Sequence, residues 1–366
     1  MVGVGRERAR VILACAIGAT LLVGLGATIL WLPEKMVAWI GAGNDPQYAI
    51  IVDKFRSTLS QSIGGLLFLV GLYFTARNVF AAEQTRLTKT FSDAITQLGS
   101  VDKDGVPVIP VRLGGIYALE RLSRDSPKDA YVICRILSQY VQVESNKWRE
   151  TLKSKVDPPT LPDIEAALIV LGIIARGKQL RRGEALRFFD AFLPNLTLSG
   201  RSLGNFHFHR TVLAGSRLDN TDCTRAGFQA CDLVSCSFAN SRLVKCEFNK
   251  VEGRGIILSS VQGAQSTFLA CDLREAEFVD SALEKCEFSD SDLSGSIFTR
   301  AKMVGAVISK TNVAGAVFDG ADLSNADFRT AVGLTADQIA AARRQPAPSQ
   351  LPTYLLVAED ADGIIQ

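Results

Sequence analysis

The sequence of 366 residues has little net charge, which already argues against one class of partner. It carries 40 Lys and Arg against 38 Asp and Glu, a formal net charge of +2. The charge is unevenly spread, since residues 1–190 carry 24 basic against 18 acidic residues and residues 191–330 carry 14 against 16. Neither part is charged strongly enough to predict nucleic-acid binding by electrostatics. We therefore expect no nucleic-acid partner.

The sequence also lacks the usual signatures of catalysis and metal binding. There are two histidines, no Cys-x-x-Cys pair among the eight cysteines, no phosphate-binding glycine-rich loop and no Gly-x-Ser-x-Gly motif. Structural zinc sites use such cysteine spacing, and many serine hydrolases carry the serine motif. We expect a protein that is not an enzyme, with no catalytic residue, no cofactor and no metal ligand.

Charge is absent altogether from two long apolar runs near the N-terminus. Residues 11–32 follow three arginines, and residues 57–76 lie between Arg56 and Arg77. Each run has the roughly 20 residues that a transmembrane helix needs. A cleaved signal peptide has a shorter apolar region, and only four apolar residues precede Cys15, too few for a lipoprotein signal. Two transmembrane helices are predicted.

The flanking arginines predict the orientation of these spans. Basic residues precede the first span and follow the second, which places both termini on the cytoplasmic side and the loop 33–56 outside. Transport and proton relay usually depend on charged residues inside the spans, and these spans contain none, so such a role is disfavoured. Residues 1–76 are therefore interpreted as a multi-pass anchor in the plasma (inner) membrane, with the lipid bilayer as partner.

Helical spacing dominates the following segment. Residues 79–98 predict an amphipathic helix that packs within its own domain, with a homo-oligomeric coiled coil as the alternative. A helix over about 113–122, a second one capped by Ser126 before Pro127, and a third over Asp163 to Arg176 predict a small bundle. The charged residues of the first of these helices are interpreted as a solvated, ion-paired face: Arg112, Glu120, Arg121, Arg124 and Asp125.

Large apolar residues recur at every fifth position in the second half of the chain. Positions 193, 198, 203 and so on to 328 form a series of 28, and 22 of these are Leu or Phe. Two places earlier, 22 of 28 residues are Ala, Ser, Thr or Cys. A period of five fits neither a helix nor a strand, but four such units make a square coil of 20 residues. We predict a solenoid with the large residue at the axis and the small one near a corner.

This pattern, plainest in the ADLSN of residues 321–325, resembles the A(D/N)LXX motif of the pentapeptide-repeat proteins. The resemblance covers residues 191–330 and implies a mainly β fold, a right-handed quadrilateral β-helix. Segments 116–122, 163–172 and 333–339 also resemble the membrane-anchored bacterial branch of that family. The expected domains are the anchor (1–76), a cytoplasmic helical linker and cap (77–190), the β-helix (191–332), and a C-terminal capping helix with a tail (333–366).

The register has informative departures at its start and near its end. Leu196, Arg201 and Phe206 occupy small positions, which predicts an irregular first coil. After the last repeat, residues 335–338 match a helix capping box and predict a helix over 336–344 that covers one end of the solenoid. The helical segment before the repeats is expected to cover the other end.

A second departure lies in the middle of the array. Gly253 and Gly263 leave two central positions empty, while Val251, Ile256 and Val261 place large residues at small positions. We hypothesise that volume is exchanged between the two inward positions, so that the core stays filled.

Cysteines and histidines fall into the same register. His207 and His209 flank an inward residue and should both point outward, where a solvated pair is favoured over a weak metal site that lacks a third ligand. The thiols are interpreted as buried small apolar residues in a reducing cytoplasm, because equivalent positions two coils apart are beyond disulfide reach. One thiol, that of Cys223, is central, and the others take the small position: Cys231, Cys236, Cys246, Cys271 and Cys286.

Together these features favour a non-enzymatic scaffold that is anchored in the membrane and presents a solenoid wall to an unidentified protein. Outward residues such as Arg274, Glu275, Glu277, Glu284 and Lys285 would carry the binding. Some pentapeptide-repeat proteins imitate DNA and bind DNA gyrase, but the weakly charged repeat region disfavours that alternative. An accessory subunit of a membrane transport or signalling system is a further alternative.

Overall fold

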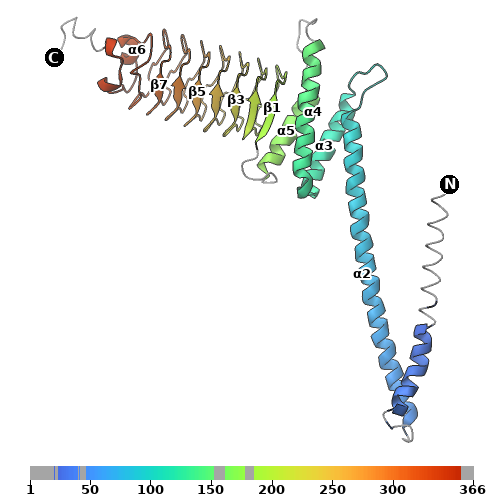
Figure 1. Cartoon of the computed structure of the whole chain (residues 1–366). Helices are drawn as coiled ribbons and strands as arrows, with labels where there is room; N and C mark the ends of the chain where they lie inside the picture. The colour runs from blue at the N-terminus through green and yellow to red at the C-terminus, as the bar shows by residue number, and fades with distance from the viewer. Residues whose placement is uncertain are drawn as a thin grey trace. The chain divides into compact units, whose positions relative to one another are not determined.

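The computed structural model describes residues 20, 24–39, 41, 47–151, 161–177 and 185–355. The chain divides into two units, Met1–Leu87 and Thr88–Gln366, and each is described by itself. Figure 1 shows the order of their helices and strands along the chain.

A single long helix, α2 (Tyr48–Leu98), contains the whole predicted second span. Within the described residues it is the one helix long and apolar enough to cross a bilayer, and none of its most apolar window, with a mean hydropathy of 1.5, is buried. Hydroxyl groups in this helix are satisfied locally where Thr58 and Ser62 donate to the carbonyls of residues four positions earlier at 2.9 and 2.8 Å. These groups therefore need no water, as an apolar environment requires.

The first predicted span is described only in part. Residues 20 and 24–39 are helical, whereas 11–19 and 21–23 lie outside the described residues. The pair of transmembrane helices is therefore unconfirmed and stays a prediction. The helix predicted over 79–98 is not a separate element but the C-terminal part of α2, because no Gly or Pro interrupts the chain after Gly71.

Three helices follow, as predicted. Their shared interior includes Ile116, Leu137 and Leu168, each fully buried. Ser126 does not cap the second helix through its side chain. Instead its hydroxyl donates to the Asp129 carboxylate at 2.6 Å, across an intervening 3₁₀ turn. The elements are α3 (Ile109–Asp125), η2 (Pro127–Asp129), α4 (Ala130–Thr151) and α5 (Pro162–Arg176).

The repeat region forms a parallel seven-stranded sheet in sequence order, which is one wall of a solenoid (Figure 1). Its first strand precedes residue 191, because Phe188 already occupies a central position of the register. The strands are β1 (Leu186–Phe189), β2 (Phe206–His209), β3 (Gly227–Gln229), β4 (Glu247–Asn249), β5 (Thr267–Leu269), β6 (Glu287–Ser289) and β7 (Val307–Ser309).

All four walls share one register, which confirms the predicted coil. The sheet pairs Phe268 with Phe288, and the other walls pair through parallel bridges such as Val212↔Asp232, Arg217↔Ser237 and Asp222↔Arg242. Within the repeats every partner lies 20 residues away, because four five-residue units complete one turn. Six such steps connect β1 to β7. The fold is therefore a parallel β-solenoid that follows a helical region.

Each corner of the coil needs a special backbone conformation. At every fifth residue from 190 to 325, φ lies between 49° and 73°, the left-handed region that disfavours residues with a Cβ. The acidic position of the repeat supports the turn that follows it. Asp232 and Asp292 accept a hydrogen bond from the backbone N–H two residues later, at 3.1 and 2.9 Å. This explains why Asp or Asn precedes the large residue so often.

The first coil, predicted to be irregular, has the same length of 20 residues per turn as the others. Leu196 and Phe206 are buried although they occupy small positions, whereas Arg201 is exposed. Phe206 pairs with Leu186, and its ring packs 5.7 Å from that of Phe188. The departure therefore changes the side chains of the first coil, not its length.

The hypothesis of exchanged volume is confirmed. Val251 and Val261 are 1% and 2% exposed, so both point inward. A Cβ added at Gly253 would lie 3.1 Å from Leu273 Cδ2 and 3.6 Å from Val251 Cγ1, because these side chains already fill the central position. Gly263 has the equivalent neighbours in Leu283 and Val261.

Both ends of the solenoid are covered. At the C-terminal end α6 (Ala336–Ala340) begins with the predicted capping box at Thr335 but is shorter than expected. The chain beyond it continues the pairing, since the amides of Leu323 and Phe328 donate to the carbonyls of Arg344 and Gln350, both at 2.8 Å. This satisfies an edge that would otherwise invite association.

The helical bundle covers the first coil. Glu165 of α5 accepts a 2.7 Å hydrogen bond from the Thr197 amide, and Arg149 of α4 donates to the Asp190 carbonyl at 2.9 Å. Gly172 of α5 lies so close to the wall that a Cβ would overlap the Ser202 carbonyl oxygen. The predicted cap is therefore built from specific contacts of α4 and α5.

Candidate functional site: the outer walls of the solenoid

The interior of the solenoid is filled by packing and leaves no room for a ligand. Six phenylalanines of one wall stack along the axis, with neighbouring ring centroids 4.7–5.5 Å apart. A second stack joins Phe278, Phe298 and Phe318 at 4.6 and 5.3 Å. Such contacts stabilise the core beyond the burial of area alone. Chemistry with external molecules is left to the outward side chains.

The thiols belong to this closed interior. All seven cysteines of the described residues are free and buried. Each thiol at a small position bonds to the carbonyl 23 residues earlier, as Cys236 does to Leu213 at 2.8 Å. Hydroxyls do the same, as Ser281 does to Leu258 at 2.6 Å. The small position therefore offers a buried carbonyl acceptor to a thiol or hydroxyl, which the pattern alone did not reveal.

Burial also makes these thiols poor ligands. Desolvation raises the pKa of Cys236, Cys246 and Cys286 to about 12, and of Cys231 and Cys271 to about 11. The thiolate, which is the metal ligand and nucleophile, is thus strongly disfavoured. Within the described ranges, no group of three or more His, Cys, Asp or Glu is placed to hold a metal ion.

His207 and His209 lie on the same strand and are both partly exposed, as predicted. The ring of His209 stacks on Phe189 at 4.9 Å. The ring of His207 covers Gly227, where an added Cβ would lie 2.5 Å from Nδ1. Burial lowers the pKa of His207, with nearby cations adding to the effect of burial and Glu247 opposing it. Each ring has a packing role, and no third ligand accompanies them in the described chain.

Of the outward residues singled out from the sequence, some form ion pairs and others do not. Arg274 binds Asp272 at 2.8 and 2.6 Å, and this bond holds the pKa of Asp272 below its ordinary value. Arg254 binds Glu275 on the next coil at 2.7 Å. Glu284 and Lys285, on another wall, have no ion pair within the described part of the chain. Exposed pairs of this kind contribute little to stability, about 0–1 kcal/mol.

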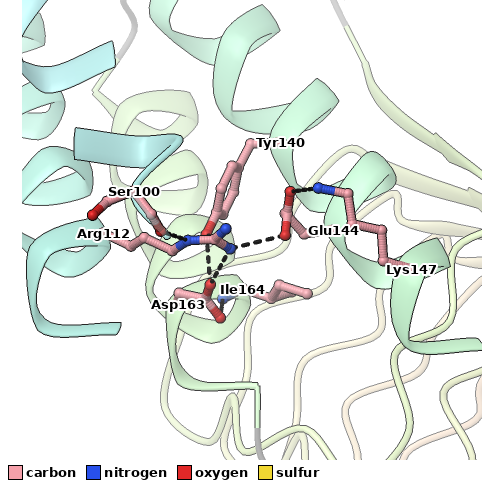
Figure 2. Close-up of polar contacts among 7 residues, drawn as sticks. All are labelled: Ser100, Arg112, Tyr140, Glu144, Lys147, Asp163 and Ile164. Carbon is pink, nitrogen blue, oxygen red and sulfur yellow. Dashed lines mark hydrogen bonds and ion pairs between the residues drawn. The ribbon is translucent and has the colours of Figure 1, made fainter. Parts of the chain in front are cut away.

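A buried polar cluster lies in the helical bundle, where the sequence had predicted only a solvated face (Figure 2). Arg112 is 2% exposed. Its guanidinium donates to Glu144 at 2.8 Å and to Asp163 at 3.3 Å, while Nε donates to the Ser100 carbonyl at 3.0 Å. The Tyr140 hydroxyl donates to Asp163 at 2.5 Å. The interpretation of Arg112 as solvated was therefore wrong, whereas Arg121 and Arg124 do form surface pairs.

The electrostatics of this cluster are those of a closed network. Burial opposes the ionised form of Glu144, but hydrogen bonds from Lys147 and Arg112 outweigh it and hold its pKa below the ordinary value. Burial likewise opposes the charge of Arg112, yet the bond to Glu144 leaves its pKa raised. Two cations meet two carboxylates, so the cluster joins α3, α4 and α5 and also binds the carbonyl of Ser100, which follows α2. It is a structural junction.

Helical spacing contained a signal for this burial. Arg112 lies four residues before Ile116 and seven before Leu119, on the face that α3 buries. Glu144 follows Leu137 and Val141 on the buried face of α4. A charged residue at a core position predicts a buried partner, since an unpaired charge there is costly.

Comparisons with known proteins add the following. The family model described as pentapeptide repeats (8 copies) matches residues 271–309 and 296–332. QnrB1, a plasmid-mediated fluoroquinolone resistance protein, is similar at 20% identity over 50% of this chain and 93% of its own, with a TM-score of 0.33. HetL, a protein involved in heterocyst differentiation regulation from the cyanobacterium Nostoc sp. strain PCC 7120, is similar at 17% identity. The match covers 47% of this chain and 94% of HetL, with a TM-score of 0.20. No curated protein matches the sequence significantly.

Proposed function

We propose that this chain, which carries pentapeptide repeats, is a non-enzymatic scaffold that is held at a membrane and binds a partner protein through an outward wall of its solenoid. Pentapeptide-repeat proteins are non-enzymatic protein-binding or DNA-mimicking scaffolds. The observation that carries the proposal is the division of labour in the repeat. Inward residues are buried in the packed core, and outward residues form columns along the rigid walls. Solenoids of this kind bind through extended surfaces.

Membrane attachment is the finer part of the proposal. It is supported by the unburied apolar window of α2 and by the arginines that flank both apolar runs. The proposed form has two spans, both termini in the cytoplasm, and a right-handed quadrilateral solenoid, as the repeats imply. Thiol labelling of intact cells tests the topology with a cysteine placed near residue 350 or in the loop 33–56. An impermeant reagent should label the loop alone, and labelling near residue 350 alone would overturn the orientation.

Wall-specific crosslinking tests the scaffold itself. A photoreactive residue is placed at Lys302 on one wall or at Glu252 on the opposite wall, both exposed in the solenoid. Crosslinking in native membranes should capture the same protein from positions along one wall and not from the opposite wall. Charge-reversing substitutions on the capturing wall should abolish the adduct. Equal, non-selective adducts from all walls would contradict a defined binding wall.

DNA mimicry is a second candidate because one wall carries a column of carboxylates. Asp232, Glu252, Asp272 and Asp292 are consecutive partners along the axis. The column is weakened as a phosphate mimic by Arg274, which neutralises Asp272. Recovery of topoisomerase subunits in the crosslinking experiment, with loss on replacing Glu252 by Gln, would favour this candidate over a general scaffold.

A further inference from the structure

A hollow of about 390 Å³ lies between the last turn of α5 and one wall of the first coils. Four cationic side chains line it, and we name them together the basic pocket: Arg176, Arg225, Arg242 and Lys245. Asp222 is the one carboxylate in its lining, so the lining carries a formal charge of +3.

The fold explains why these cations converge. Arg225 and Lys245 take equivalent corner positions one coil apart, and Arg242 is the outward residue of the same wall, paired with Asp222 in register. Arg176 is in the last turn of α5, where a cation is favoured by the helix dipole. The close contact of Gly172 with Ser202 fixes the helix against this wall. The basic pocket is therefore assembled from rigid elements.

The cations of the basic pocket differ from most others in the solenoid because they form no ion pair with any residue that the structure describes. Of the twelve arginines in residues 185–355, eight form ion pairs. Arg225 and Arg242 form none with the described residues, and neither do Arg176 and Lys245. Asp222 does not serve them, since its Oδ1 accepts from the Thr224 amide at 3.1 Å and from the Thr224 hydroxyl at 2.7 Å.

Like charges on neighbouring coils repel one another and cost stability unless an anion lies between them. Three guanidinium groups present planar pairs of N–H donors, the geometry that matches phosphate oxygens. The Ser202 hydroxyl and the Asn205 amide, which also line the hollow, add neutral donors. The volume lies within the range of about 300–1,000 Å³ that is typical of small-molecule pockets.

We propose that the basic pocket binds a phosphate-bearing anion. The chemistry is shared by a free polyphosphate or phosphate ester and by a phospholipid headgroup. The proposal goes beyond the scaffold function, because it concerns a ligand site at the junction of α5 with the solenoid and is independent of which wall binds a protein.

Binding is measured on the full chain in a neutral detergent by isothermal titration calorimetry with inorganic tripolyphosphate. The pocket variant is Arg225→Gln with Arg242→Gln, and the matched control is Arg254→Gln with Arg274→Gln, which removes the same charge from paired residues elsewhere. All four side chains are exposed, so both variants should retain the fold, as checked by circular dichroism. We expect at least a roughly tenfold loss of affinity in the pocket variant and little change in the control.

The source of the phosphate is distinguished with nanodiscs. The full chain is placed in phosphatidylcholine alone or with 20% phosphatidylglycerol added (roughly one anionic headgroup in five), and amide exchange is followed over residues 221–245. Protection by the anionic lipid, lost in the pocket variant, assigns a headgroup, whereas protection by tripolyphosphate alone assigns a soluble ligand. The proposal is overturned if tripolyphosphate binds the pocket and control variants equally, if neither tripolyphosphate binding nor protection by the anionic lipid is observed, or if tetraglutamate competes as well as tripolyphosphate.

Discussion

The exchange of volume between neighbouring inward positions predicts a strong coupling between two substitutions. Val251→Ala removes two methyl groups from a side chain that is 1% exposed. Gly253→Leu inserts a side chain where a Cβ alone would already touch Leu273 and Val251. The double variant restores the ordinary repeat, with a small residue at position 251 and a large one at position 253.

The magnitudes follow from burial and packing. Loss of the two buried methyl groups and the cavity left behind should cost about 2 kcal/mol. Overpacking at Gly253 should cost about 1–3 kcal/mol, because Leu273 Cδ2 lies 3.1 Å from the added Cβ and both backbones are held by coil-to-coil hydrogen bonds. The double variant should lose less than about 1 kcal/mol, so the interaction free energy is about 2–5 kcal/mol in favour of the pair.

Amide hydrogen exchange over residues 246–275 of the full chain in detergent measures the local free energy of opening. Local opening is preferred to a global melt, because repeat arrays need not unfold in one step. The control combines Val251→Ala with Gly263→Leu, the same exchange of residue types at positions that are not neighbours. Its two effects should add. Additive destabilisation in the Val251/Gly253 pair as well would refute the exchange of volume.

Three further predictions follow from the same structure. Gly172→Ala should destabilise the docking of α5 by about 1–3 kcal/mol, seen as faster amide exchange near Ser202 with α6 unaffected; unchanged exchange would contradict the close contact. The solenoid thiols should not react with Ellman's reagent at pH 8 until urea unfolds the coils, because burial raises their pKa to about 11–12; rapid native labelling would show that they are accessible. Arg112→Met should destabilise the helical bundle by about 3–5 kcal/mol, by leaving the buried Asp163 without a cation and Glu144 with Lys147 alone. The folded pKa of Glu144 is depressed, so its stabilisation is present above its ordinary pKa of 4.5 and lost as the pH falls through the folded value. Amide hydrogen exchange in α4 should therefore become faster as the pH is lowered, and this acceleration should be smaller in the Arg112→Met variant than in the natural chain. The same pH dependence of exchange in both proteins would refute this.

The repeat could be predicted in detail because its rule is local and recurs in every coil. Each large residue at a fifth position has the same environment, so the pattern predicts burial at Leu273 and Phe288 and even the compensation at Val251. The left-handed corners and the thiol bonds to carbonyls 23 residues earlier were missed. They depend on backbone geometry that the identity of a single residue, such as Ala270 or Cys236, does not reveal.

The helical bundle shows the opposite case. Its helices were predicted from spacing and proline positions, but the environment of Arg112 was not, because Glu144 and Asp163 are 32 and 51 residues away in the sequence. The basic pocket is similar, since it unites α5 with residues from two coils. In both cases the chemistry comes from contacts between segments that no local pattern connects.

The sequence by itself determined the period of the solenoid, the filling of its core, the apolar helix and the absence of recognisable catalytic motifs. Periodic burial and the length of an apolar run are properties of consecutive residues, so they can be read without coordinates. Only the tertiary structure decided which charges are buried, paired or left without a counter-ion. The energy of a charge depends on its distance to other charges and on its exposure to water, and folding sets both.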